Sequence, residues 1–202
     1  MQSSPAIVFD LGKVLLDFDY AVAVRRLLAQ STCSASELLA LINQSPLLLQ
    51  YECGTLTTAA FYEKVREVSG YGGSFEAFME MFGDIFTPIP EMVQLHADLV
   101  ARGYPVFIFS NTNEMAVRYI RKKFSFFSRF DGYVFSYEHA SMKPEASLYE
   151  VVEKLSGRRG GELIYLDDRA ENIEAGRARG WRAFLHESPA GTRAWVEAAL
   201  AV

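Results

Sequence analysis

Three short apolar runs in this chain each lead directly into polar residues that suit phosphate chemistry. These residues are Asp10 after the run 6–9, Ser110 and Asn111 after 106–109, and Asp167 and Asp168 after 163–166. A carboxylate can attack phosphorus and form a covalent aspartyl phosphate, which divides a hard hydrolysis into two easier steps. A hydroxyl group and backbone N–H groups can bind phosphoryl oxygens, and a carboxylate pair can hold a divalent cation. The residue types therefore predict a site for phosphoryl transfer.

The apolar runs have the character of buried strands. Each run has four residues and is rich in aliphatic or aromatic side chains, which is typical of strands covered on both faces in a parallel sheet. In open sheets of this kind, ligands bind just beyond the carboxyl ends of the strands. The polar residues after the three runs are therefore predicted to meet at one edge of a sheet, although most of the chain separates the first from the last.

The pattern beyond Pro90 alternates between strands and helices. After the first strand we expect strands at 105–109, 132–136, 162–166 and 181–185, with helices at 92–102, 114–123, 144–155, 169–179 and the C-terminus. This alternation predicts an α/β fold with a doubly wound, parallel, five-stranded, Rossmann-like sheet. Residues 1–16 and 88–202 are assigned to this core, which would carry the catalytic residues.

The segment 17–87 differs from the core because its pattern is helical throughout. We expect helices at 20–30, 37–43, 46–51, 59–69 and 75–83, each with a Ser, Thr, Asp or Pro near its start. Several large apolar residues recur at helical spacing and are expected to form a core: Phe75, Phe78, Met79, Phe82 and Phe86. The segment is therefore predicted to be an all-helical domain inserted after the first strand.

Composition narrows the class of protein. The chain has 202 residues, of which 50% are hydrophobic, and a net charge of −5 that falls entirely within 17–87. An acidic chain without a basic stripe argues against nucleic-acid binding, and no apolar stretch approaches the ~20 residues of a membrane span. No signal peptide is recognised, so a cytoplasmic location is expected and the two cysteines are expected to be unpaired. The sequence leaves the oligomeric state open.

The loop after the first strand and a lysine farther along complete the predicted phosphate site. The backbone N–H groups of Leu11 and Gly12 follow Asp10 directly and can cradle phosphoryl oxygens, as can Ser110 and the backbone of Asn111. Lys143 precedes Pro144, which can start a helix. An isolated lysine there would simply face solvent. Together with the other motifs, it is expected to bring positive charge to the phosphoryl group and to the nucleophile.

The adjacent carboxylates predict a metal site. Asp167 and Asp168 beside Asp10 would repel one another unless a cation lay among them. Mg²⁺ is the natural candidate because it favours carboxylates, waters and a substrate oxygen, and it would neutralise charge on the transferring group. Asn172, one turn into the next helix, is a candidate to orient one of the carboxylates. A pair of Asp residues can also simply cap that helix.

These motifs resemble those of the haloacid dehalogenase superfamily over nearly the whole chain. Asp10 resembles the nucleophile of the first motif, Ser110 the second, Lys143 with Pro144 the third, and Asp167 with Asp168 the fourth. The helical segment 17–87 is similar to a C1-type cap. The stretches 9–14 and 110–113 look most like the alpha-D-glucose-1-phosphate phosphatase branch. The resemblance implies that Asp10, the Gly12 carbonyl and Asp168 hold Mg²⁺.

One position departs from the family pattern. Most phosphatases of this family carry a second Asp, as general acid and base, at the position that Gly12 occupies here. A missing general acid costs about 10²–10⁴ in rate. The enzyme can then be restricted to good leaving groups, such as a sugar 1-phosphate, or use Asp17 or Asp19 instead. Asp19 is also a natural N-cap for the helix that begins at residue 20.

Three functions follow from these observations. The first is a Mg²⁺-dependent phosphatase for a small phosphorylated metabolite, with a sugar phosphate as a candidate. The second is a 2-haloacid dehalogenase, which uses the same nucleophile at carbon without a metal. The third is a catalytically weak relative that binds a partner. Tyr51 and Glu52 are candidates for substrate contact, and Arg25 and Arg26 for a second anionic group.

Overall fold

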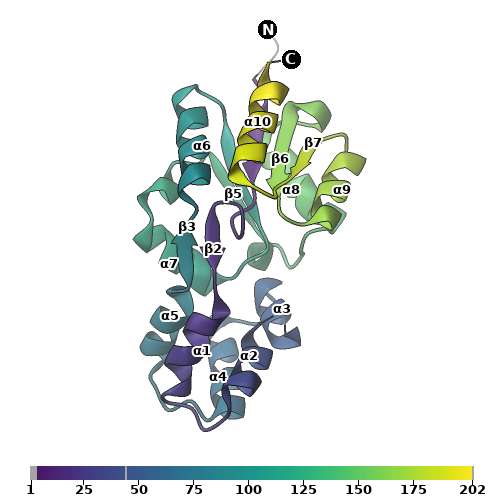
Figure 1. Cartoon of the computed structure of the whole chain (residues 1–202). Helices are drawn as coiled ribbons and strands as arrows, with labels where there is room; N and C mark the ends of the chain where they lie inside the picture. The colour runs from purple at the N-terminus through teal and green to yellow at the C-terminus, as the bar shows by residue number, and fades with distance from the viewer. Residues whose placement is uncertain (1–3, 44, 202) are drawn as a thin grey trace.

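A parallel sheet of five strands forms the centre of the larger part of the molecule (Figure 1). The computed structural model describes residues 4–43 and 45–201. The strands, in their order across the sheet, are β5 (Gly132–Phe135), β4 (Val106–Ser110), β1 (Ala6–Phe9), β6 (Leu163–Asp167) and β7 (Arg182–Leu185). The predicted doubly wound, parallel, five-stranded fold is confirmed.

The register of the central strands brings their carboxyl ends together. Phe9 of β1 lies opposite Ile108 of β4 on one side and opposite Leu166 of β6 on the other. Asp10 directly follows β1 and Asp167 is the last residue of β6, so the two carboxylates lie at the same edge of the sheet. This alignment is what makes residues from distant parts of the sequence neighbours.

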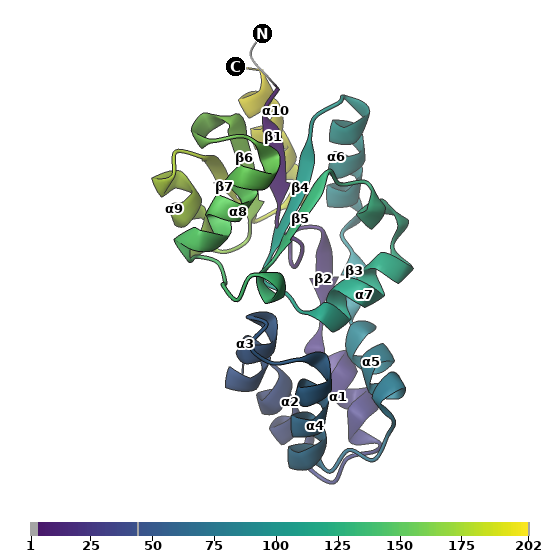
Figure 2. The ribbon, with the colours of Figure 1, turned by 180° about the vertical axis from the view of Figure 1, so that it is seen from behind.

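Helices cover both faces of the sheet (Figure 2). Alternate residues of a strand point to opposite faces: Ile7 and Phe9 pack in one buried cluster, and Ala6 and Val8 in another. The first cluster includes residues of α6 (Pro90–Ala101), α7 (Glu114–Lys123) and α10 (Pro189–Leu200). The second includes residues of α8 (Ala146–Ser156) and α9 (Ala170–Ala178). Burial on both faces explains the continuous apolar character of the strands.

Five helices form a separate layer beside the carboxyl edge of the sheet (Figures 1 and 2). They are α1 (Tyr20–Leu28), α2 (Ala35–Ile42), α3 (Pro46–Glu52), α4 (Thr58–Ser69) and α5 (Phe75–Gly83). The side chains of Ser34, Ser45, Thr57 and Ser74 cap α2, α3, α4 and α5. The helices share a hydrophobic cluster rich in aromatic rings. We call this layer, residues 20–83, the helical insertion.

A two-stranded antiparallel ribbon joins the insertion to the core, and the sequence analysis missed it. The strands β2 (Leu16–Phe18) and β3 (Phe86–Pro88) have three residues each, too short for an alternating pattern. Phe86, expected to extend a helical stripe, lies in β3 because α5 ends at Gly83. The expected domain boundaries, 16/17 and 87/88, fall inside this ribbon.

The start of α8 also differs from the expectation. The helix predicted to begin at Pro144 begins at Ala146, because Glu145 has extended backbone angles and serves as the N-cap residue. Short 3-10 helices occupy Ser125–Ser128, Ser136–Glu138 and Gly160–Glu162.

Cys33 and Cys53 are free thiols. Within the described residues, no helix has the length and apolar character that crossing a bilayer requires.

The stability of the insertion is expected to depend on Phe78. Its side chain is fully buried and contacts the rings of Phe61, Tyr62, Tyr71 and Phe82. Replacement by alanine removes these contacts and leaves a cavity, so Phe78→Ala should cost about 3–5 kcal/mol in the free energy of unfolding. Urea denaturation followed by circular dichroism measures this.

The matched control for this prediction is Val68→Ala on the neighbouring helix α4. Val68 is 66% exposed, so its replacement should change the free energy of unfolding by no more than about 0.5 kcal/mol. Equal effects of the two substitutions would contradict the assignment of Phe78 to the core of the insertion.

Candidate active site

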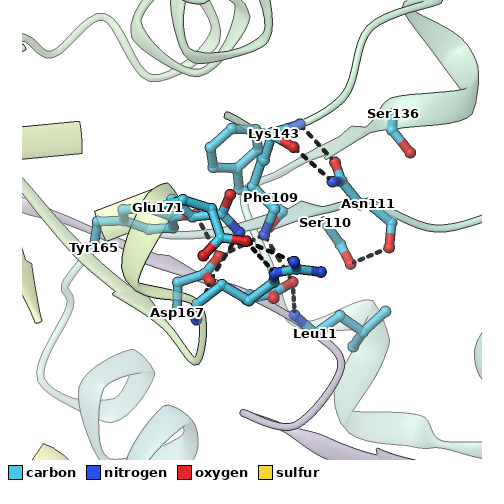
Figure 3. A network of polar contacts seen from close by, with 12 residues as sticks. Leu11, Phe109, Ser110, Asn111, Ser136, Lys143, Tyr165, Asp167 and Glu171 are labelled. Atoms are coloured by element: carbon cyan, nitrogen blue, oxygen red, sulfur yellow. Dashed lines mark hydrogen bonds and ion pairs between the residues drawn. The ribbon is translucent and has the colours of Figure 1, made fainter. Parts of the chain in front are cut away.

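A buried lysine ammonium group lies at the centre of the site (Figure 3). Lys143 Nζ is 3.1 Å from Asp10 Oδ1, 2.6 Å from Asp167 Oδ2 and 2.9 Å from the carbonyl oxygen of Phe109. Burial by itself would lower the pKa of Lys143, but the carboxylates of Asp10 and Asp167 outweigh it and raise the pKa. The lysine is therefore a permanent positive charge between two carboxylates.

Asp10 occupies the loop directly after β1, in contact with this charge. Its Oδ1 accepts a hydrogen bond from the Leu11 backbone N–H at 2.6 Å in addition to the Lys143 contact. Burial raises the pKa of Asp10 to about 7, and the carboxylates of Asp167 and Asp168 add to this while Lys143 opposes it. Among the residues that the structure describes, none donates a hydrogen bond to Asp10 Oδ2. One carboxylate oxygen of Asp10 is thus positioned by the protein and the other is available.

Asp167 is held by four donors. Its Oδ2 accepts from Lys143 Nζ and, at 2.5 Å, from the Tyr165 hydroxyl, while its Oδ1 accepts from the Arg169 backbone N–H and from Asn172 Nδ2. Burial alone would raise its pKa, but Lys143 and these hydrogen bonds lower it. The expectation that Asn172 orients one of the carboxylates is confirmed. Tyr165 was missed, because an aromatic residue inside a strand is indistinguishable from core in sequence.

Asp168 completes a cluster of three carboxylates. Asp10, Asp167 and Asp168 each offer an oxygen within 4.8 Å of the others. Burial and the neighbouring charge of Asp167 raise the pKa of Asp168. In the described part of the chain, no other residue donates a hydrogen bond to its carboxylate. Three carboxylates with only one lysine among them leave excess negative charge, and oxygen ligands of this kind fit Mg²⁺.

The loop after β4 supports the lysine. The side chain of Asn111 accepts from the Lys143 backbone N–H at 2.8 Å and donates to the Lys143 carbonyl oxygen at 3.0 Å. Ser110 is buried and lines the cavity beside Lys143. The backbone N–H of Leu11, predicted to cradle phosphoryl oxygens, donates a hydrogen bond to Asp10 Oδ1 at 2.6 Å. The structure thus brings the residues predicted to bind phosphate and metal to one edge of the sheet, with Asn111 tied to Lys143.

A cavity of about 560 Å³ lies between this edge and the helical insertion. The core contributes charged and polar groups to its walls, including Asp10, Gly12, Ser110, Lys143 and Asp168. The ribbon, the insertion and Asp19 between them contribute mainly apolar or aromatic side chains: Phe18, Tyr20, Ala21, Leu39, Leu48 and Leu49. Asp19, Asn43 and Glu52 add polar groups to this wall. A ligand bound at the carboxylates would therefore place the rest of its structure against the insertion.

Gly12 faces an aromatic ring of the ribbon. A Cβ atom built at Gly12 would lie 2.9 Å from Cε1 of Phe18, closer than such atoms approach in proteins. A side chain at this position would require Phe18 to move. The ring therefore occupies space next to the position where the resemblance expects an acid.

The acids considered as substitutes have other partners. Asp17 is exposed and forms an ion pair with Lys13, which together with the Phe18 backbone lowers its pKa. Asp19 accepts a hydrogen bond from the Ala21 backbone N–H at 2.8 Å and is the N-cap of α1, as its alternative interpretation predicted.

The two arginines of α1 have no evident role in the site. Arg26 forms an ion pair with Asp84 at 2.8 Å. Neither Arg25 nor Arg26 is among the described residues that line the cavity. The structure therefore gives no support to their predicted contact with a second anionic group.

Comparison with known proteins shows that the chain is similar to two phosphatases. The chain is 25% identical over 194 residues to D-ribitol-5-phosphate phosphatase of Bacteroides thetaiotaomicron, covering 93% of this chain and 94% of the relative. It is 27% identical over 176 residues to a sesquiterpene phosphatase of Aspergillus oryzae, covering 87% and 86%.

A solved structure has the same fold. A haloacid dehalogenase family enzyme of Bacteroides thetaiotaomicron, in complex with magnesium and inorganic phosphate, superposes with a TM-score of 0.80 at 21% identity, covering 92% of this chain and 95% of the other. The model of the haloacid dehalogenase-like hydrolases matches residues 5–180. This chain therefore belongs to the haloacid dehalogenase-like hydrolase family.

Proposed function

We propose that this protein is a Mg²⁺-dependent phosphatase that hydrolyses a small phosphorylated metabolite through an aspartyl-phosphate intermediate. The observation that carries the proposal is the cluster of Asp10, Asp167 and Asp168 around the buried ammonium of Lys143. Two relatives that match most of the chain are phosphatases by name, which supports this reaction class.

Asp10 is assigned the role of nucleophile. Its Oδ1 contacts Leu11 and Lys143. These contacts orient the carboxylate so that one oxygen can attack phosphorus while the other remains within reach of the metal. Lys143 neutralises charge on the nucleophile and on the phosphoryl group, and Ser110 with the Asn111 backbone binds phosphoryl oxygens. These fixed charges and dipoles are worth more in a partly closed cavity than in water.

Mg²⁺ is assigned to Asp10, Asp168 and the carbonyl oxygen of Gly12. When bound, it neutralises charge on the transferring phosphoryl group. Asp167 is near enough to contribute, but four donors already satisfy its two oxygens. Its proposed role is therefore to hold Lys143 and the start of α9 in place.

The side chains that the insertion contributes to the cavity wall suggest two classes of leaving group. A sugar or polyol phosphate is the first candidate, since Asn43 and Glu52 offer polar groups to hydroxyls and one relative acts on D-ribitol 5-phosphate by name. A phosphate with an apolar body is the second, because Leu39 and Leu49 line the cavity although they are 36% and 45% exposed. The relative named as a sesquiterpene phosphatase supports this alternative.

The other two functions considered from the sequence have less support. A dehalogenase needs the nucleophile but no metal. In such an enzyme, burial of the Asp168 carboxylate beside Asp167 would be unfavourable and would serve no step of the reaction. A relative that only binds a partner would not need Lys143 fixed on Asp10.

Removal of the nucleophile should abolish turnover. Wild-type protein with Mg²⁺ is expected to release phosphate from a panel of sugar phosphates, polyol phosphates, isoprenyl phosphates and p-nitrophenyl phosphate. Asp10→Asn should lose roughly 10⁴-fold or more in kcat, because no carboxylate remains to attack phosphorus. Asp98→Asn on the surface of α6 is the matched control and should retain wild-type activity. Retained turnover in Asp10→Asn would refute the proposed intermediate.

Mg²⁺ should stabilise the folded protein, increasingly so at higher pH. The pKa of Asp10 is about 7 in the folded state against an ordinary 3.8, so without metal the folded state loses stability as the pH rises through this range. A cation favours the ionised carboxylate, so its effect is small where Asp10 is protonated and grows as the pH passes 7.

Thermal melting with Mg²⁺ or with EDTA, at about pH 5 and about pH 8, measures this coupling. The increase in Tm caused by Mg²⁺ should be larger at the higher pH, and Asp10→Asn should reduce that difference. An equal increase at both pH values, or none, would contradict the assignment of Asp10 as a ligand.

A further inference from the structure

The proposed reaction needs a proton donor that the loop after β1 does not supply. A departing alkoxide must be protonated, and Gly12 has no side chain to do this. The Phe18 ring lies where a side chain at Gly12 would begin. A carboxylic acid on another wall of the cavity can supply this proton.

Among the residues that the structure describes, four acids line the cavity: Asp10, Asp19, Glu52 and Asp168. Asp10 is the proposed nucleophile, and Asp168 is a proposed metal ligand. Asp19 is exposed and is engaged as the N-cap of α1. Glu52, the last residue of α3, is the acid that remains, and it belongs to the wall that the leaving group would face.

The backbone at Glu52 is tied to the catalytic edge of the core. The Ser136 hydroxyl lies 2.5 Å from the carbonyl oxygen of Glu52 and also accepts a hydrogen bond from the Thr112 backbone N–H at 2.9 Å. Thr112 is two residues beyond Ser110. One serine therefore links the end of α3 to the loop that carries part of the phosphate site.

The residues on both sides of Glu52 strengthen this connection. The Tyr51 hydroxyl accepts from the Met115 backbone N–H at 3.1 Å. Gly54 has a φ of +75°, and a Cβ there would lie 2.0 Å from the Tyr137 carbonyl oxygen, so only glycine permits so close an approach. The end of α3 is thus docked at three points on the core.

The Glu52 side chain has the environment of a proton carrier. It is partly buried in the cavity wall, and in the described structure it forms no hydrogen bond or ion pair with another side chain. Burial raises its pKa to about 8; Asp10 contributes in the same direction and Arg169 opposes it. At neutral pH the group holds a proton that it can give up.

We propose that Glu52 is the general acid and base of this site, carried by the helical insertion in place of the side chain absent at Gly12. The inference rests on the proposed phosphatase function. In the first step Asp10 attacks phosphorus, the bond from phosphorus to the leaving oxygen breaks, and the Glu52 proton passes to that oxygen. In the second, Glu52 takes a proton from water as the water attacks, and the Asp10–phosphorus bond breaks.

Glu52→Gln tests the proposal through its dependence on the leaving group. For an alkyl phosphate that the wild type hydrolyses, kcat/KM should fall by about 10²–10⁴ because the departing alkoxide is not protonated. For p-nitrophenyl phosphate, whose leaving group needs no proton, the rapid first release of p-nitrophenolate should remain within about tenfold of wild type. The later steady state should be slower, since water attack loses its base.

Two further measurements separate a proton-transfer role from a structural one. The fall of kcat/KM at alkaline pH for the alkyl substrate should disappear in Glu52→Gln. Binding of orthovanadate in the presence of Mg²⁺, and thermal stability, should stay close to wild type. Asp19→Asn, which keeps a good N-cap, is the competing variant and should show no selective loss for the alkyl substrate.

The results that would contradict the role of Glu52 differ from those that would contradict the phosphatase function. Equal losses for both substrates in Glu52→Gln, or a selective loss in Asp19→Asn instead, would overturn the assignment of Glu52 while leaving the phosphatase function intact. Absence of phosphate release by the wild type from every ester would overturn the proposed function and this inference with it.

Discussion

The site is organised around the ammonium group of Lys143, buried between Asp10 and Asp167. A buried charge is tolerable only when it is paired and hydrogen-bonded, and loss of one partner leaves another charge uncompensated. The lysine therefore fixes the ends of β1 and β6 relative to each other, and Asn111 fixes the lysine from the end of β4. Three strands of the sheet converge on one positive charge, and their register puts them there.

The single positive charge of Lys143 does not neutralise the three carboxylates of the cluster. Three carboxylates share one lysine, and the pKa values of Asp10 and Asp168 are raised while that of Asp167 is lowered. The asymmetry follows from the contacts: donors satisfy Asp167, whereas Asp10 and Asp168 keep carboxylate oxygens without a protein donor in the described structure. A bound cation would complete the neutralisation, which links metal binding to folding and to pH. The insertion then supplies what the sheet edge lacks, an apolar wall and the acid Glu52.

The sequence predicts the parts of this arrangement that depend on residue type and strand pattern. Apolar runs predicted the central strands, and the residues that follow these runs pointed to Asp10, Ser110 and the carboxylate pair. Lys143 follows no such run and was predicted from its place before Pro144 together with the other motifs. The ribbon of β2 and β3 was not predictable, because three-residue strands have no usable periodicity. Tyr165 and Phe18 were missed for a related reason: only tertiary contacts distinguish an aromatic residue at a functional site from one in the core. The docking of α3 through Ser136 likewise depends on contacts between distant segments.

The most direct test of the account is to look for the covalent intermediate on Asp10. Wild-type protein mixed with Mg²⁺ and a substrate from the panel is quenched rapidly in acid, digested and examined by mass spectrometry. The account predicts one added phosphoryl group on the peptide that contains Asp10, absent from Asp10→Asn and from protein quenched without substrate. Turnover without any phosphorylated peptide, or phosphorylation at another residue, would contradict the role of Asp10 on which the rest of the mechanism depends.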